Sequence, residues 1–364
     1  MRLTSKSTQS GVTLVELMIA LVLGLIIAAG LSQIFVSSQK TYRITEEQSR
    51  LQESARFGFE FITRGFREAG YSGCRAIERL NIQVIANAPT VSYNANNIVS
   101  GSEASLTSPG TWSPALNSDI EDDVIAGTDT LSIQKAGSCG GTLTQQGQSN
   151  SSTSEIKIPT SNSCNISAGD VLMLTDCEHA HIFRANSNSN NPGNSGNSDE
   201  TISIAASMNS STHFCLNQAN AGTGSCGTGN AKLYGSDAEL LTFSSLTYYI
   251  GTGAGGRNAL FVYDGTASSK TELVEGVEDM QIQYGVDADE NDIVDNYQTA
   301  ETVNTAGNWD KVISAEISIL LTTQKDNLTT AEQTFIYNGT TVNASDKRLH
   351  HVYTTVISIR NRVQ

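Results

Sequence analysis

The acidic run DADENDIVD, which begins at Asp287, has the spacing of a loop that binds a metal ion. Its side-chain oxygens stand at positions 1, 3, 5 and 9 of an EF-hand-like loop, and position 7 offers a backbone carbonyl. Hard oxygen ligands at this spacing suit Ca²⁺, so the sequence predicts a structural Ca²⁺ ion rather than a catalytic one. The predicted ligands are Asp287, Asp289, Asn291, Ile293 and Asp295.

Two positions depart from the calcium-loop pattern. Asp292 stands where such a loop has its turn glycine, and Gln298 stands where it has its closing glutamate. The competing interpretation is an acidic, solvated connection between two strands of a hairpin. The sequence requires no other cofactor.

Cysteine is the second residue type that offers chemistry. An even number of cysteines on an exported domain predicts disulfides. Cys215 and Cys226 are close enough in sequence to close one loop. A pairing of Cys164 with Cys177 would leave Cys74 to pair with Cys139. The six candidates are Cys74, Cys139, Cys164, Cys177, Cys215 and Cys226.

A zinc site is the alternative use of the cysteine-rich region. Its ligands would be Cys177, His179, His181 and His213, but the spacing C-E-H-A-H matches no familiar four-ligand pattern. We therefore favour disulfides or free thiols over zinc.

No set of residues suggests catalysis. The run GTGAGG at 251–256 satisfies G-x-G-x-x-G, but a dinucleotide site needs a helix after it, and the chain continues into the strand-like RNALFVYDG. This glycine run therefore predicts a hairpin loop. The histidines, including the pair His350–His351, lack a nucleophile partner, so the sequence predicts a protein that is not an enzyme.

A glutamate, Glu16, lies inside the apolar run GVTLVELMIALVLGLIIAAGLSQIFV at 11–36. The run is long enough to cross roughly 30 Å of hydrocarbon as a helix, and an ionisable residue within such a span is a functional candidate. Arg2 and Lys6 precede it and favour a cytoplasmic amino terminus. A secretory signal peptide is less consistent, because no A-x-A pattern follows the apolar run.

The helix is expected to continue beyond the apolar run and to become amphipathic. Apolar residues recur three, four or seven positions apart, which is the pattern of one buried helix face. They are Ile44, Leu51, Ala55, Phe59, Ile62, Phe66 and Ala69. Expected ion pairs on the other face are Glu46–Arg50, Glu53–Arg56 and Glu60–Arg64. We expect Gly58 and Gly65 to weaken the helix locally, and Gly70 and Gly73 to end it.

Gly11, the apolar helix with Glu16 and the amphipathic continuation together resemble a type IV prepilin. The resemblance implies a basic leader ending in Gly11, cleavage of the Gly11–Val12 bond by a prepilin peptidase, and N-methylation of Val12. It also implies that Glu16, fifth after the cut, engages the amine of a neighbouring subunit and sets the axial register of assembly. Val12 departs from the phenylalanine or methionine that is usual there. The competing interpretation is that Glu16 only reaches the cytoplasmic headgroups.

The remainder of the chain predicts a β-rich exported domain. The net charge is −15, with 22 basic and 37 acidic residues, which argues against nucleic-acid binding. Strands are expected in a mostly antiparallel sheet packed on the amphipathic helix, giving an α+β fold. Their expected ranges are 129–136, 154–159, 170–177, 181–185, 241–251, 258–265, 273–287, 311–323 and 350–361. The polar tract 186–200 is predicted to be a surface loop.

Several segments in their order look like the PilW family of minor pilins. They are FREAGYSGC (66–74), VLMLTDCEHAHIF (171–183), the strands from Glu239 to Gly265, ELVEGVEDMQIQYGVD (272–287) and TTVISIRNR (354–362). The resemblance implies a type IV pilin fold and a non-catalytic subunit that helps initiate or cap a pilus. Residues 75–170 carry no such resemblance.

The resemblance also predicts an organisation and partners. The expected parts are a leader (1–11), a transmembrane and assembly segment (12–36), an amphipathic helix (37–70) and a periplasmic β-rich domain (71–364). Expected partners are other minor pilins, the major pilin, the prepilin peptidase, the inner-membrane assembly platform and, before assembly, inner-membrane lipid. Two alternatives remain: a J-type pseudopilin of type II secretion, and an anchored surface-binding protein that never assembles.

Overall fold

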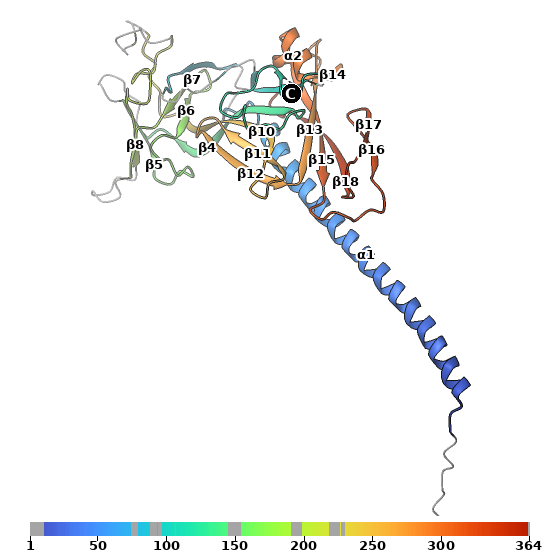
Figure 1. The fold of residues 1–364 in the computed structure, drawn as a ribbon. Coiled ribbons are helices and arrows are strands. Elements are labelled where there is room, and N and C mark those ends of the chain that lie inside the picture. Colours follow the sequence, from blue (N-terminus) through green and yellow to red (C-terminus); the bar gives the residue numbers. More distant parts are fainter. Residues whose placement is uncertain are drawn as a thin grey trace, which may run out of the picture.

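The computed structural model combines one long helix with a β-rich domain at its carboxyl end, so the fold is α+β (Figure 1). Helix α1 spans Leu14–Arg67, and its first half projects away from the domain. The structure describes residues 11–73, 79–87, 93, 97–105, 107–144, 154–190, 199–217, 226 and 230–362.

The two halves of α1 have different surroundings. Every residue from Gly11 to Arg43 is exposed, including the large apolar side chains up to Val36. The second half packs on the domain, and its buried residues include Leu51, Ile62 and Phe66. The sequence pattern is therefore confirmed in its main features, although Ile44 and Phe59 are only partly buried.

Strands make up most of the domain. Those of its first part are β1 (Asn81–Val84), β2 (Val99–Ala104), β3 (Trp112–Ser113), β4 (Thr130–Thr142), β5 (Ser154–Pro159), β6 (Val171–Thr175), β7 (His179–Arg184), β8 (Ser187–Asn190) and β9 (Asp199–Ile204). Those of its second part are β10 (Glu239–Thr252), β11 (Asn258–Asp264), β12 (Ser269–Glu275), β13 (Val277–Val286), β14 (Asn296–Gln298), β15 (Val312–Thr322), β16 (Thr334–Tyr337), β17 (Thr340–Asn343) and β18 (His350–Ser358). The short helices are α2 (Ala300–Ala306) and η3 (Trp309–Lys311).

The described strands form two main sheets. The larger follows the order β1-β7-β6-β10-β4-β2-β3, with β11 and β12 added beside β10. The smaller follows the order β14-β13-β15-β18, so β18 lies at its edge. Strand pairs are antiparallel apart from β1 with β7, which confirms the predicted mostly antiparallel arrangement.

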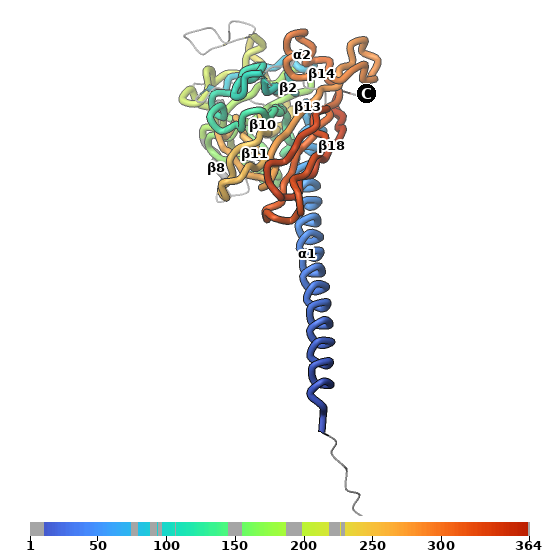
Figure 2. Tube along the Cα trace, turned by 45° about the vertical axis from the view of Figure 1, so that its right-hand side comes forward, coloured from blue at the N-terminus to red at the C-terminus, as the bar shows by residue number. Residues whose placement is uncertain are grey.

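One apolar core joins α1 to both main sheets. Ile62 and Phe66 of the helix share it with Ile133 and Tyr248 of the larger sheet and Ile317 of the smaller. Figure 2 shows α1 entering the domain on the side where β18 lies.

A glycine allows the close approach of α1 to the larger sheet. A Cβ atom on Gly65 would lie 2.6 Å from the Tyr248 hydroxyl and 2.7 Å from Cδ1 of Ile133. The Tyr248 hydroxyl in turn donates a hydrogen bond to the Phe61 carbonyl at 3.2 Å. The prediction that Gly65 weakens the helix locally did not include this contact, and a larger side chain would not fit there.

The structure corrects some local predictions. The expected strand 273–287 is two strands, β12 and β13, separated by Gly276, whose φ of 85° lies in the left-handed region. The expected loop 186–200 contains β8 and the start of β9, while residues 191–198 lie outside the described residues. The glycine run is a hairpin loop between β10 and β11, as predicted.

The helix ion pairs are also partly different from the prediction. Glu46–Arg50 is present at 2.8 Å. Within the described residues, the expected pairs Glu53–Arg56 and Glu60–Arg64 do not form, and Arg64 instead contacts Glu68 at 3.3 Å. The helix ends at Arg67, and Gly70 follows with φ of 72°, close to the predicted end.

Candidate functional site

The start of α1 carries the predicted processing and assembly residues. Gly11, Val12 and Thr13 precede the helix, which begins at Leu14. Thr13 is the N-cap, because its side-chain oxygen accepts a hydrogen bond from the Glu16 N–H at 3.3 Å. Glu16 therefore lies in the first turn, where a carboxylate interacts favourably with the helix dipole.

The N-cap was not predicted, although the sequence carries a signal for it. Thr13 and Glu16 have the spacing T-x-x-E of a capping box, which marks the beginning of a helix. The cap places the Gly11–Val12 bond in the non-helical segment before the first turn.

The fold does not explain the glycine at position 11. A Cβ atom there would meet nothing within 4 Å, and Gly11 is not among the residues with a positive φ. Packing and backbone conformation would therefore accept other residues at this position.

The apolar half of α1, residues 14–36, is likewise unexplained by contacts within the chain. Of the helices in the described residues, α1 alone has the length and apolarity to cross a membrane, and none of its apolar window is buried in the domain. Cβ atoms added at Gly24 and Gly30 would meet nothing within 4 Å. Burying this surface requires lipid or other helices.

The ends of the chain match two family models. Residues 6–32 match the prokaryotic N-terminal methylation motif, which is the prepilin signal. Residues 247–361 match the type IV pilus-assembly protein W, PilW. The two matches together cover less than half of the chain, and they show that it is similar to type IV pilin-like proteins, with its carboxyl-terminal part similar to PilW. The prepilin signal and the apolar helix also indicate that the chain is anchored in a membrane.

The PilW match covers the carboxyl-terminal part of the described domain. It begins in the middle of β10, at Thr247, and ends just after β18. The resemblance noted over 171–246 therefore lies outside the PilW match. The searches of curated proteins and of solved structures found no significant match.

The acidic loop lies inside the PilW region, between β13 and β14. Carboxylate oxygens of Asp287, Asp289 and Asp295 lie within 4.8 Å of one another. The Asp287 carboxylate accepts hydrogen bonds from the N–H groups of Asn291 at 3.0 Å and Asp292 at 2.8 Å. The chain therefore curls around Asp287, as a cation-binding loop must.

The departures from the calcium pattern have different consequences. Asp292, at the position of the usual glycine, has φ of 65° and so adopts the left-handed conformation that the turn needs. Gln298 lies in β14 opposite Tyr284, so it is part of the sheet rather than a closing ligand. Lys311 approaches the loop as well, because its ammonium donates to the Ala288 carbonyl at 2.8 Å.

The electrostatics of the acidic loop favour an ionised Asp287. This side chain is only 4% exposed, and burial raises its pKa. Hydrogen bonds from the N–H groups of Asn291, Asp292 and Glu290 act in the opposite direction, and the net pKa lies below the ordinary value. A cation would therefore meet a carboxylate that already carries its charge at neutral pH.

The disulfides confirm one predicted pairing and overturn the other two. Cys215 and Cys226 are bonded, as predicted. Cys139, in β4, is bonded to Cys164, so the pairings of Cys164 with Cys177 and of Cys74 with Cys139 were wrong. Cys177 is also disulfide-bonded, and Cys74 lies outside the described residues.

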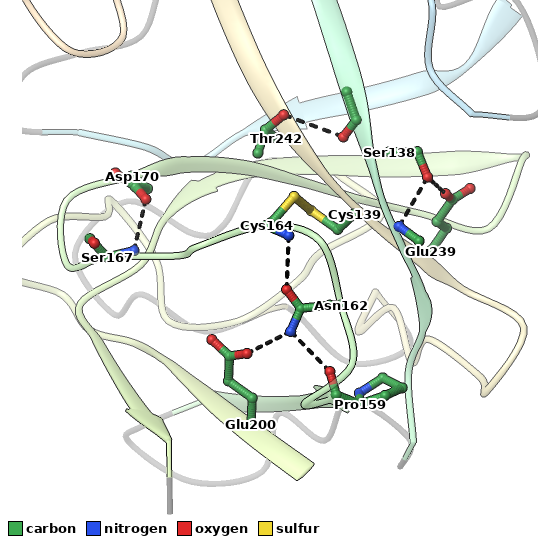
Figure 3. The surroundings of a disulfide bond; sticks show 12 residues. Ser138, Cys139, Pro159, Asn162, Cys164, Ser167, Asp170, Glu200, Glu239 and Thr242 are labelled. Atoms are coloured by element: carbon green, nitrogen blue, oxygen red, sulfur yellow. Dashed lines mark hydrogen bonds between the residues drawn. A yellow bond between two sulfur atoms is a disulfide. The ribbon is translucent and has the colours of Figure 1, made fainter. Parts of the chain in front are cut away.

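A polar network fixes the chain around the Cys139–Cys164 bond (Figure 3). The Asn162 amide donates to the Pro159 carbonyl at 2.9 Å and to the Glu200 carboxylate at 2.6 Å. Its side-chain oxygen accepts the Cys164 N–H at 3.0 Å. These contacts turn the chain after β5 back towards β4, which brings the two sulfur atoms together.

The alternative zinc site is not formed. The sulfur atoms of Cys177 and Cys215 are in disulfides. His181 is 1% exposed, and its ring nitrogens contact the Tyr234 hydroxyl at 2.6 Å and the Cys215 carbonyl at 2.9 Å. Burial lowers the pKa of His181 to about 4, so it is a neutral core residue at physiological pH.

Proposed function

We propose that this protein is a minor pilin, a non-catalytic subunit that helps initiate or cap a type IV pilus after cleavage of the Gly11–Val12 bond. The observation that carries the proposal is the glycine before the N-cap, which packing does not require, in a chain that matches the prepilin signal. Before assembly, α1 would span the inner membrane with its amino terminus in the cytoplasm and the β-rich domain in the periplasm.

The charge on Glu16 gives the apolar helix its role in assembly. No lysine, arginine or histidine occurs between Gly11 and Lys40, so no side chain on this part of the helix can neutralise Glu16. Cleavage would create an amine on Val12, which is a cation at the same depth in the bilayer. A pair between Glu16 of one subunit and the amine of the next offsets the cost of burying either charge alone.

Partners follow from this assembly mechanism. We infer contacts with other minor pilins and the major pilin through α1, and with the prepilin peptidase and the assembly platform during export. The PilW match favours the pilus over the alternative, a J-type pseudopilin of type II secretion.

The test changes Gly11→Ala and Glu16→Ala separately and measures processing and surface piliation, with Gly24→Ala as the processing control. We expect Gly11→Ala to block the shortened mature form, and Glu16→Ala to allow processing but not assembly. Normal pili from both variants would overturn the proposal. A secretion defect with normal pili would instead identify a pseudopilin.

We further propose that the acidic loop holds a structural Ca²⁺ ion through Asp287, Asp289 and Asp295. The convergence of three carboxylates and the left-handed turn at Asp292 support this. Because Gln298 belongs to β14, the ion would lack the closing ligand of an EF-hand, and we expect affinity at the weak end of the range, on the order of 0.1–1 mM.

The calcium proposal is tested by calorimetric titration of the EDTA-treated protein. We expect binding heat and a higher melting temperature with Ca²⁺, both lost in Asp289→Ala, whose carboxylate accepts a hydrogen bond from the Asn291 amide at 3.0 Å. The exposed Glu332→Ala is the matched control. Absence of heat and of stabilisation in the unmodified protein at about 1 mM Ca²⁺ would remove the proposal.

A further inference from the structure

A basic groove lies between the packed half of α1 and the carboxyl end of β18. Its volume is about 910 Å³, and it is open to solvent along one side. Figures 1 and 2 show α1 and the last strand side by side at this level. Its charged lining residues are Arg56, Glu60, Arg64, Arg67, Glu68 and Arg360.

The two acids in the groove neutralise at most one of its four arginines. Glu68 is shared between Arg64 at 3.3 Å and Lys135, in β4, at 2.5 Å. Burial raises the pKa of Glu68, but the contacts with Lys135 and Arg64 lower it by more, so the net pKa lies below the ordinary value. Glu60 makes no ion pair within the described part of the chain.

Three of the groove's arginines have no side-chain partner among the described residues. Arg56, Arg67 and Arg360 are exposed, and within the described residues their side chains make no ion pair or hydrogen bond. Acids outnumber bases by 37 to 22 in the whole chain. A local excess of unpaired arginines is therefore the reverse of the overall charge, and it is best explained by an anionic partner.

The position of the groove excludes lipid as the source of that anion. Arg56 lies 20 residues beyond Val36 on α1, which is about 30 Å along the helix axis. Membrane headgroups at the end of the apolar half are therefore out of reach. Phosphates of nucleic acid are disfavoured because the rest of this acidic surface would repel them.

We propose that this arginine groove binds an acidic segment of a neighbouring pilin-type subunit. The inference rests on the proposed function, because assembly through α1 would bring another subunit beside this face of the helix. Guanidinium groups suit the task, since each can form two parallel hydrogen bonds to one carboxylate. The partly exposed Phe59, which also lines the groove, offers apolar contact to the same segment.

The test is site-specific photo-crosslinking in intact piliated cells. The photoreactive residue p-benzoylphenylalanine replaces Glu60, which lines the groove and has no ion-pair partner in the described chain. The crosslinked peptide is identified by mass spectrometry. The yield is then compared in the Arg56→Glu/Arg67→Glu variant, in the milder Arg56→Gln/Arg67→Gln variant, and in Lys347→Glu, an exposed charge reversal outside the groove.

We expect the crosslink to map to a net-acidic segment of a pilin-type subunit. Its yield should fall about tenfold in the double Glu variant, less in the double Gln variant, and not at all in Lys347→Glu. A crosslink to a neutral or basic segment, no crosslink, or a yield unchanged by Arg→Glu would overturn the groove proposal. If processing and piliation still depend on Gly11 and Glu16, that failure leaves the minor-pilin assignment standing.

Discussion

The two halves of α1 are one continuous helix. In the packed half, contacts with the rest of the chain account for the unusual residues, whereas in the apolar half they do not. In the packed half, Glu47 is 1% exposed and lies 3.1 Å from the Lys325 ammonium. In the apolar half, Glu16 is exposed, with the Thr13 cap next to it and no basic side chain on the same segment.

The glycines in and before α1 differ between the two halves in the same way. Gly65 is needed because the larger sheet leaves no room for a Cβ atom, whereas Gly11, Gly24 and Gly30 face open space. The comparison shows that residues which look equally unusual in sequence divide into those required for folding and those that need a partner outside the folded chain. Changes in the two halves should therefore affect different measurements.

The largest expected effect is on assembly. Glu16→Ala should abolish surface pili and leave the unfolding of the domain unchanged, because Glu16 makes no contact with the domain. The measurement compares piliation with denaturant unfolding in detergent, followed by tryptophan fluorescence. Trp309, which is 3% exposed, reports on the domain. A loss of domain stability in Glu16→Ala would contradict the division between the halves.

Gly65→Leu should destabilise the packed half by about 3 kcal/mol, because the added side chain would collide with Tyr248 and Ile133. Gly30→Leu on the same helix is the matched control, and we expect its free energy of unfolding to match the unmodified protein. Equal stability of the two variants would show that α1 is not packed as described.

Glu47→Ala should lower the free energy of unfolding by about 2 kcal/mol, because it removes the ion pair between the buried Glu47 carboxylate and the partly exposed Lys325, which keeps only Glu46 at 3.9 Å. We expect processing at Gly11 to proceed as in the unmodified protein. Lys325→Ala, measured alone and together with Glu47→Ala, isolates the contribution of the pair. Full additivity of the two changes would mean that the ion pair contributes nothing.

A smaller effect is expected from pH, and only on the domain. Burial raises the pKa of Asp129 to about 8. The folded state therefore holds a proton that the unfolded state releases near pH 4, and stability falls as pH rises towards 8. Below about pH 6.5 the buried neutral His181 has the opposite effect and makes stability rise with pH. The reason is that only the unfolded state protonates this histidine there.

The effect of Asp129 on stability can therefore be measured without that of His181 between pH 6.5 and 8. We expect the free energy of unfolding to fall by about 1.6 kcal/mol across this range, and Asp129→Asn to remove the dependence. Asp129 accepts N–H groups from Ala104 and Ile282, and asparagine retains one acceptor oxygen, so a moderate overall loss of stability is also expected. A rise in stability towards pH 8 would show that Asp129 is ionised in the folded domain.

The sequence predicted features that depend on local spacing. The buried face of α1 follows from positions such as Leu51, Ala55 and Ile62, and β5 has the predicted bounds. The prepilin features are equally local, since Gly11 and Glu16 lie five residues apart.

Features that depend on distant contacts could not be predicted. The burial of Glu47 depends on Lys325, which the chain returns to α1 only after β15. The pairing of Cys139 with Cys164 depends on how β5 and the turn at Asn162 fold back, which no cysteine spacing encodes. The requirement for Gly65 likewise arises only when β4 and β10 are in place.

The central claim is that the glycine before the N-cap marks a cleavage site. Mass spectrometry of the amino-terminal peptide of the protein from cells tests it most directly. We predict a mature chain that begins at Val12 with a methylated amine, and a chain that retains the leader in Gly11→Ala. A protein that still begins at Met1, or that is cut at another bond, would contradict the account.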